Sequence, residues 1–199
     1  MFSPRLNRLR LASLLVATML FSLLVAACGT EESASSSEGG EAEAPAAGDV
    51  LVQKVMPSDR IYTVDDLEAA GLKTLHHYDV AELPEALDAW HTMYKVKGTA
   101  LEYEARFYAS HEDAVEHGTA WAETVSGEDA IVIGDEVWWE EGHTHRRKCS
   151  RGAETPHSGC SYSARYGEFI TLGNMILLCE GPNSHEALLA CKAVLESLD

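Results

Sequence analysis

The chain has 199 residues, of which 46% are hydrophobic, and it carries 15 basic against 32 acidic side chains, a formal net charge of −17. So acidic a surface repels phosphate backbones, which excludes nucleic acid as an expected partner. The hydrophobic fraction is sufficient for a globular domain with a buried core.

The first 27 residues have the three parts of an export signal. Arg5, Arg8 and Arg10 precede an uncharged apolar run over 11–27, which ends in small residues. This order predicts a cleaved signal peptide. The alternative is a transmembrane anchor, but a run of 17 residues is short for roughly 30 Å of hydrocarbon, and a polar tract follows it. A signal cleaved without lipidation is the other alternative.

The four residues Val25-Ala26-Ala27-Cys28 resemble the lipobox of bacterial lipoproteins. The resemblance implies cleavage before Cys28, a diacylglycerol on the Cys28 sulfur, and acylation (commonly palmitate) of the new amino group. It therefore implies an extracytoplasmic protein that its lipid holds at the bacterial cell membrane. Which membrane of the envelope carries it is left open.

The chain divides into three parts by composition. Residues 1–27 form the predicted signal peptide, and residues 28–48 comprise the lipidated cysteine and a tract of Ser, Ala, Gly and Glu without aromatic or large aliphatic side chains. Such a tract buries too little apolar surface to offset its ordering entropy, so we expect a flexible acidic tether. Residues 49–199 have the size of one globular domain.

The sequence of the first half of this domain predicts three helices and one strand. Thr63 with Asp66 is typical of a helix start, and Gly71 of its end. Leu83, Leu87, Trp90 and Tyr94 recur at helical spacing and predict a second helix. Residues 101–109 alternate apolar and polar and predict a half-buried strand, after which Ser110 caps a third helix.

The second half predicts strands and a final helix. Residues 131–133 and 137–139 flank Gly134-Asp135 and predict a hairpin. A strand over 162–172, a turn at Gly173-Asn174 and a strand over 175–179 follow, and Asn183 with Glu186 caps the last helix. This order favours an α+β fold, with a mainly antiparallel sheet and helices packed on one face.

Four cysteines besides Cys28 fall in the domain. An even number in an exported chain predicts two disulfides, and three connectivities are open. The turn residues between Cys149 and Cys160 favour that pair, and a helix that returns over its own strand favours Cys179 with Cys191. No pair has the C-x-x-C spacing of redox or zinc sites.

Histidine and acidic residues gather at Glu140, Glu141, His143 and His145. Two histidines separated by one residue project from the same side of a strand, so together with the glutamates they could bind zinc or copper. The alternative is a set of exposed loop histidines, and no cofactor other than the lipid is expected.

Arg146, Arg147, Lys148 and Arg151 form the main basic cluster, which is either a patch for an anionic ligand or partner or a solvated, charge-balanced loop. For catalysis the sequence offers no G-x-S-x-G, no S-x-x-K and no glycine-rich phosphate loop, so no catalytic residue is nominated. An unrecognised hydrolase is the least favoured class.

The ending of the domain, a Gly-Asn turn, a strand with Cys179 and a helix with Cys191, distantly resembles extracellular sensor domains of some bacterial kinases. The resemblance favours a non-catalytic binding or interaction module, whose small-molecule or protein partner is unknown. A metal-binding lipoprotein that uses His143 and His145 is the alternative.

Overall fold

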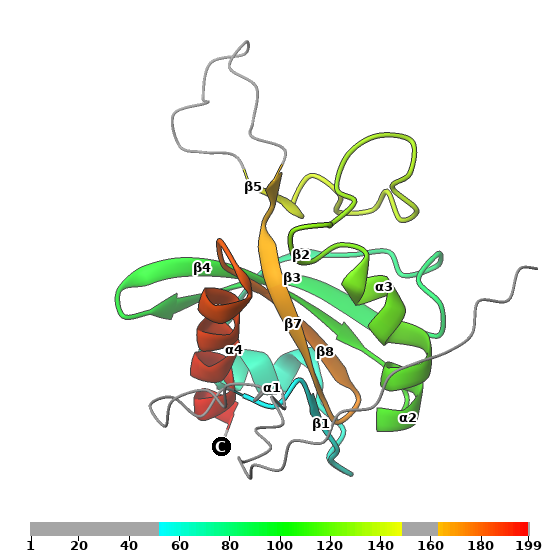
Figure 1. Ribbon diagram of the computed structural model, residues 1–199. Coiled ribbons are helices and arrows are strands. Elements are labelled where there is room, and N and C mark those ends of the chain that lie inside the picture. The colour runs from blue at the N-terminus through cyan, green and yellow to red at the C-terminus, as the bar shows by residue number, and fades with distance from the viewer. Residues whose placement is uncertain (1–51, 149–162, 199) are drawn as a thin grey trace, which may run out of the picture. The chain divides into compact units, whose positions relative to one another are not determined.

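The computed structural model describes residues 52–148 and 163–198, and all of them fall in one compact unit, Ala46–Asp199 (Figure 1). The predicted signal peptide, Cys28, the predicted tether, Cys149 and Cys160 lie outside the described residues. No helix in the described ranges is long and apolar enough to cross a bilayer.

A six-stranded sheet forms the centre of the domain, in the order β1-β7-β8-β4-β3-β2. Only β1 runs parallel to its neighbour β7, and every other pair is antiparallel. Two further strands, β5 and β6, pair with each other in a small separate sheet. The bounds are β1 Val55–Met56, β2 Lys73–His77, β3 Asp88–Val96, β4 Thr99–Phe107, β5 Arg147–Lys148, β6 Ser163–Ala164, β7 Tyr166–Leu172 and β8 Met175–Glu180.

The helices begin where the sequence predicts. In α1, Val64–Ala69, the Asp66 carboxylate accepts hydrogen bonds from the Thr63 N–H and hydroxyl. The Ser110 hydroxyl caps α2, and the Asn183 side chain accepts from the Glu186 N–H at the start of α4. The remaining bounds are α2 His111–Asp113, the π-helical turn η1 Ala114–Gly118, α3 Thr119–Glu123 and α4 Ser184–Leu198.

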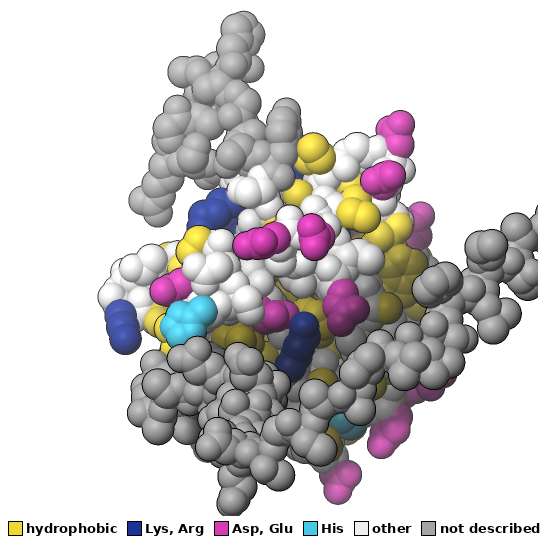
Figure 2. All heavy atoms as spheres, in the orientation of Figure 1, with side chains coloured by type: hydrophobic (Ala, Val, Ile, Leu, Met, Phe, Trp, Pro, Cys, Tyr) yellow, Lys and Arg dark blue, Asp and Glu magenta, His cyan; other side chains and the backbone are white. Residues whose placement is uncertain are grey.

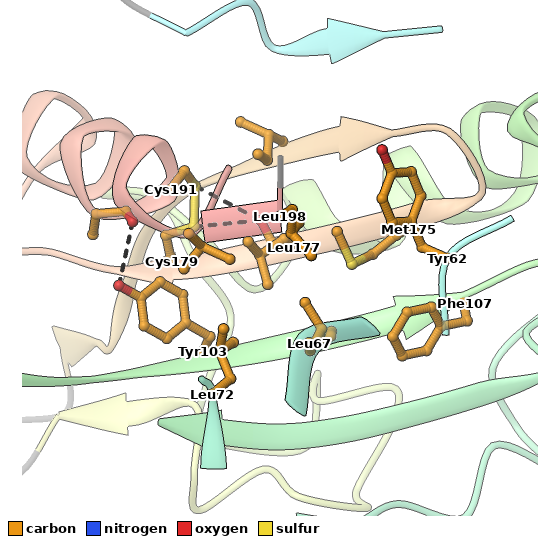
Figure 3. Packing of buried hydrophobic residues seen from close by; sticks show 14 of the residues in the cluster. Tyr62, Leu67, Leu72, Tyr103, Phe107, Met175, Leu177, Cys179, Cys191 and Leu198 are labelled. Atoms are coloured by element: carbon orange, nitrogen blue, oxygen red, sulfur yellow. Dashed lines mark hydrogen bonds between the residues drawn. A yellow bond between two sulfur atoms is a disulfide. The ribbon is translucent and has the colours of Figure 1, made fainter. Parts of the chain in front are cut away.

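One face of the sheet packs against α1 and α4. Tyr103, Leu177 and Cys179 point from β4 and β8 into this core, where they meet Leu67 of α1 and Cys191 of α4 (Figure 3). The disulfide between Cys179 and Cys191, with Cα atoms 5.6 Å apart, confirms that predicted pair. The other predicted pair, Cys149–Cys160, falls on residues that are not described.

The opposite face of the sheet is covered as well, so the prediction that helices pack on one face only is wrong. Ile176 and Leu178 of β8 point away from α4 and pack against α3 residues such as Ala122. Gly118 allows this close approach, because a Cβ there would lie 2.4 Å from Ile176 Cδ1 and 2.6 Å from the Tyr108 hydroxyl. The fold is therefore α+β with a mainly antiparallel, mixed sheet between two covering layers.

Two predicted elements are absent from the described residues. The helix predicted through Leu83 and Tyr94 is replaced by turns and by β3, which pairs with β4 along all nine residues of each strand. Long-range pairing overrides the helical spacing here, and Lys97-Gly98, both at positive φ, closes the hairpin. The hairpin predicted over 131–139 is an irregular loop, whose Trp139 is buried against the sheet.

Candidate functional site

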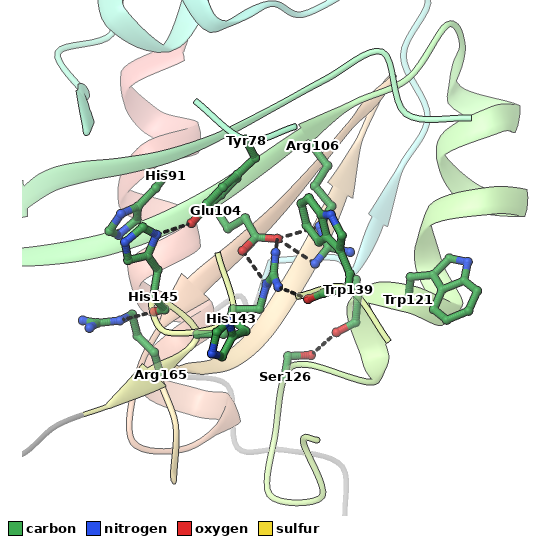
Figure 4. Close-up of polar contacts among 12 residues, drawn as sticks. Tyr78, His91, Glu104, Arg106, Trp121, Ser126, Trp139, His143, His145 and Arg165 are labelled. Atoms are coloured by element: carbon green, nitrogen blue, oxygen red, sulfur yellow. Dashed lines mark hydrogen bonds and ion pairs between the residues drawn. The ribbon is translucent and has the colours of Figure 1, made fainter. Parts of the chain in front are cut away.

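The second face of the sheet buries a set of three charges at its centre. Glu104 and Arg106 of β4 are fully buried, and Arg146 is 1% exposed. Arg146 donates from Nε to Glu104 Oε2 at 2.8 Å, and Arg106 donates from Nε to Glu104 Oε1 at 2.7 Å (Figure 4). One carboxylate thus binds two guanidinium groups from distant parts of the chain.

Residues 139–148, here called the crossing segment, run across this face of the sheet. Contacts with aromatic side chains hold the segment there. The Arg146 guanidinium lies 4.1 Å from the centre of the Trp139 ring and donates to the Trp139 carbonyl at 3.2 Å. Gly142, at φ +67°, sits directly on the Tyr78 ring, where a Cβ would come within 2.3 Å of a ring carbon. Only glycine fits at this position, because it combines left-handed backbone with close approach.

The electrostatics of this centre favour an ionised Glu104. Burial alone would raise the pKa of its carboxyl, but the Arg146 and Arg106 guanidinium groups together hold that pKa below its usual range. A buried carboxylate with two cations leaves an excess positive charge in a medium of low dielectric. Both arginines therefore depend on Glu104, and removal of its charge leaves them without compensation.

Beside this centre lie three histidines from separate segments, here called the histidine cluster: His76 of β2, His91 of β3 and His145 of the crossing segment. The His91 and His145 rings stack with centroids 4.6 Å apart, and the His76 and His145 rings meet edge to face at 5.3 Å. The Tyr78 hydroxyl lies 3.0 Å from His145 Nδ1. His145 joins this cluster where the crossing segment returns to the sheet, one residue before the buried Arg146.

Two carboxylates contact the His76 and His91 rings. His76 Nε2 lies 3.2 Å from Glu141 Oε1, and His91 Nε2 lies 2.8 Å from Glu102 Oε2. Glu102 also pairs with Arg165 at 2.9 Å. Partial burial would raise the pKa of Glu102, but the bond from His91 and the charge of Arg165 lower it. Glu102 is therefore ionised at neutral pH, and its carboxylate contacts both the His91 ring and the Arg165 guanidinium.

The environment of His145 lowers the pKa of its imidazole. Partial burial is the main cause, and the proximity of His91 and His76 adds to it. The Arg165 guanidinium, whose Nε donates to the His145 carbonyl at 2.6 Å, also disfavours the imidazolium form, while Glu102 favours it. This environment therefore favours the neutral form of the His145 ring.

The structure does not bring the predicted metal ligands Glu140, Glu141, His143 and His145 together. His143 and His145 lie in turns rather than on a strand, so their predicted same-side projection is wrong. His143 Nδ1 contacts the Glu140 backbone carbonyl at 2.7 Å, and Glu141 contacts His76 instead. Within the described residues no three His, Cys, Asp or Glu side chains are placed to hold a metal ion.

The basic cluster is divided between the interior and the surface. Arg146 is buried on Glu104, Arg147 and Lys148 form β5, and Arg151 lies outside the described residues. The Lys148 ammonium pairs with Glu180 at 3.3 Å. Arg146 is a core residue, so neither a surface patch for an anionic ligand nor a solvated loop describes it.

A hollow lies at the start of α4. Its volume is about 420 Å³, and its lining includes Gly127, Tyr166, Glu168 and Ser184. Glu168 is already engaged there, since it pairs with Lys54 at 2.9 Å and accepts from the Ser184 hydroxyl at 3.1 Å. The histidine cluster is the stronger candidate, because three titratable rings converge on it.

Sequence reasoning missed His76, His91, Glu102 and Arg106 as site residues. The alternation over 101–109 was visible, and it placed Glu102, Glu104 and Arg106 together on the polar side of a strand. Alternate acidic and basic residues on that side were the available signal for a charge cluster. Its burial depends on the crossing segment, which no local pattern predicts.

Comparison with known proteins identifies the family. Residues 63–199 match the model of the Family of unknown function (DUF6810), and the chain belongs to this family. The match spans the elements from α1 to α4 and so includes both the buried charges and the histidine cluster. No curated protein matches the chain, and no solved structure does.

We expect Glu104→Gln to destabilise the domain by about 3–5 kcal/mol, because it leaves Arg106 and Arg146 buried without a counter-charge. Chemical denaturation measures the free energy of unfolding. Glu116→Gln makes the same charge change at an exposed position and should alter stability by less than about 0.5 kcal/mol. Equal effects of the two substitutions would contradict the role given to Glu104.

Proposed function

We propose that the protein is an exported lipoprotein, held at the cell membrane by lipid on Cys28, whose domain is a non-catalytic binding module. We further propose that the histidine cluster is its binding site. The observation that carries this second step is the convergence of three imidazole rings from three segments on one partly exposed patch.

The export half of the proposal is supported by two independent features. The sequence around Cys28 resembles a lipobox, and the domain has a disulfide between Cys179 and Cys191. Disulfides persist in oxidising compartments and are rare where glutathione and thioredoxin keep thiols reduced. The acidic surface, with carboxylates spread over the described part of the face in Figure 2, offers no attraction to anionic headgroups. Acyl chains would therefore have to supply the membrane affinity.

The binding half is supported by how the cluster is presented. The His76 and Glu141 side chains are 48% and 37% exposed, whereas the side chain of His91, which pairs with His76 across β2 and β3, is 8% exposed. A ligand would thus meet partly exposed imidazole and carboxylate groups beside the buried Glu104 centre. Polar groups placed on a rigid base give orientation and specificity in small-molecule sites.

The hydrogen bonds of the histidine rings favour binding over catalysis. Among the described residues they join carboxylates, the Tyr78 hydroxyl and backbone carbonyls, and none joins a Ser, Thr or Cys side chain. A serine or cysteine nucleophile needs such a base beside it. The proposal therefore assigns no catalytic residue.

For the anchor, we expect Cys28→Ser to abolish incorporation of a labelled fatty acid and to block lipoprotein-type cleavage, because a hydroxyl cannot replace the sulfur as acceptor. Metabolic labelling followed by electrophoresis measures both. The matched control is Cys149→Ser, which should label like wild type. Labelling of Cys28→Ser at the wild-type level would overturn the lipid assignment.

For the binding site, the thermal unfolding midpoint is measured against separate panels of dicarboxylates, amino acids, monosaccharides, nucleosides, and zinc and copper salts. A ligand at 100 times its Kd stabilises by about 2.7 kcal/mol, which raises the midpoint by several degrees. We expect His145→Ala to abolish the rise and His143→Ala, two residues away, to retain it.

A panel without any rise in wild-type protein would contradict a small-molecule site. A rise that both variants retain would place the site elsewhere. A zinc or copper response that both His143→Ala and His145→Ala abolish would favour the metal-binding alternative, which uses both side chains, over the histidine cluster.

A further inference from the structure

Acidic and basic side chains are distributed unevenly along the domain. Residues 107–145 contain ten acidic side chains and no lysine or arginine, and residues 74–94 also lack lysine and arginine. The two segments meet in the fold, because Leu83 shares a hydrophobic cluster with the partly buried Trp121 and Trp138. One region of the surface is therefore built from segments that carry no lysine or arginine.

Two tryptophans form the apolar centre of this region. Trp121 of α3 and Trp138 of the following loop lie with their ring centroids 3.9 Å apart. The Trp138 indole N–H donates to the Thr124 hydroxyl at 2.8 Å, and that hydroxyl donates to the Trp121 carbonyl at 2.9 Å. Both tryptophans remain partly exposed. Hydrogen bonds within the domain thus hold a partly exposed aromatic pair in place.

Exposed carboxylates and one exposed apolar side chain accompany the pair. Ile133, in the same loop as Trp138, is 42% exposed. The exposed acidic residues of these segments make no side-chain hydrogen bond or ion pair with a described residue, and they are Glu82, Glu85, Glu123, Glu128, Asp129, Asp135 and Glu136. Figure 2 shows hydrophobic side chains among acidic ones over α3 and the loop that follows it. Trp121, Ile133 and Trp138 with these acidic residues are here called the tryptophan surface.

A surface of one charge sign favours a partner of the opposite sign. Neighbouring carboxylates repel one another, and a basic partner relieves that repulsion and is steered toward the surface from a distance. Anionic lipid headgroups and phosphate backbones carry the wrong sign. Solubility accounts for the carboxylates but not for the partly exposed rings beside them, because apolar area rimmed by polar residues marks interaction surfaces.

The indole rings narrow the chemistry of the partner. The face of an indole attracts ammonium and guanidinium groups, and tryptophan does so more strongly than tyrosine or phenylalanine. Ile133 offers an apolar contact in the same loop. The combination fits a segment that mixes basic and apolar side chains better than a purely cationic ligand.

We propose that the tryptophan surface docks a segment of another protein in which basic and apolar side chains are mixed. Lysine or arginine side chains of the partner pair with the carboxylates and cover the indole faces, and an apolar side chain packs against Trp121, Ile133 and Trp138. The surface uses none of the rings of the histidine cluster. The proposal therefore goes beyond the proposed function and stands whether or not that cluster binds a small molecule.

The probe is a labelled hexapeptide of alternating lysine and leucine, and its binding to the full-length protein is measured by fluorescence anisotropy at low salt. In a second hexapeptide serine replaces leucine, and in a third glutamate replaces lysine. We expect the lysine–serine peptide to bind at least about tenfold more weakly, because it buries no large apolar side chain. The glutamate–leucine peptide should not bind, and about 0.5 M salt should weaken the lysine–leucine peptide.

Charge-reversed variants locate the binding. Asp135→Lys with Glu136→Lys, beside Trp138, should weaken the lysine–leucine peptide by about tenfold or more, because like charges then face each other. Asp59→Lys with Glu196→Lys makes the same change in net charge at exposed positions before α1 and on α4. This control should weaken binding by less than about threefold, since salt screens distant charges. Equal losses would overturn the proposal, because the attraction would then be general.

A second pair of variants tests the apolar contact. Ile133→Ser should weaken the lysine–leucine peptide by about threefold or more and leave the lysine–serine peptide unchanged. Ile61→Ser, at a residue that is 55% exposed outside the tryptophan surface, should affect neither peptide. Both substitutions are at exposed positions, where effects on stability are small. Unchanged binding by Ile133→Ser, or equal binding of the lysine–leucine and glutamate–leucine peptides by wild type, would overturn the proposal.

His145→Ala separates the tryptophan surface from the histidine cluster. The variant should bind the lysine–leucine peptide like wild type, although it should lose any response to a ligand of the cluster. Loss of peptide binding in His145→Ala would move the peptide to the cluster and overturn the tryptophan surface. Wild-type peptide binding without a response in any small-molecule panel would support the surface and contradict only the proposal for the cluster.

Discussion

Glu104 accepts hydrogen bonds from Arg106, two positions along the same strand, and from Arg146, which is separated from it by the whole of α2, η1, α3 and an irregular loop. A buried carboxylate between two guanidinium groups is weak evidence for added stability, since desolvation offsets most of the attraction. In this protein the contact instead determines how the crossing segment is placed on the sheet. The crossing segment can satisfy the charges on β4 only in the register that places Arg146 over Glu104, and that register also delivers His145 to His91.

The order of elements and several of their ends could be predicted from the sequence. The Thr63–Asp66 and Ser110 caps and the Cys179–Cys191 pair each join residues that are close in the sequence, so they could be predicted from it. The helix predicted through Leu83 and Tyr94 failed because pairing with β4, a long-range interaction, decided the conformation of β3. The covering of the second sheet face could not be predicted for a related reason, since it depends on long-range packing of α3 and of loop residues such as Trp139.

The candidate site was harder to predict than the fold. His143 and His145 attracted attention by their spacing, yet only His145 belongs to the cluster, and its partners His76 and His91 come from other strands. Spacing along the chain does not report contacts across a sheet. If the domain is a binding module, its recognition groups come from three segments that meet on one face of the sheet.

The central claim, that Arg146 on Glu104 assembles the histidine cluster, is tested most directly by the pKa of His145, measured by nuclear magnetic resonance in wild type and in Arg146→Met. Methionine fills a similar length without the charge that Glu104 binds. The account predicts a His145 pKa below 6.5 in wild type that returns to about 6.5 in the variant as the crossing segment leaves the sheet. An equally lowered His145 pKa in both proteins would contradict it, because the cluster would then assemble without its anchor.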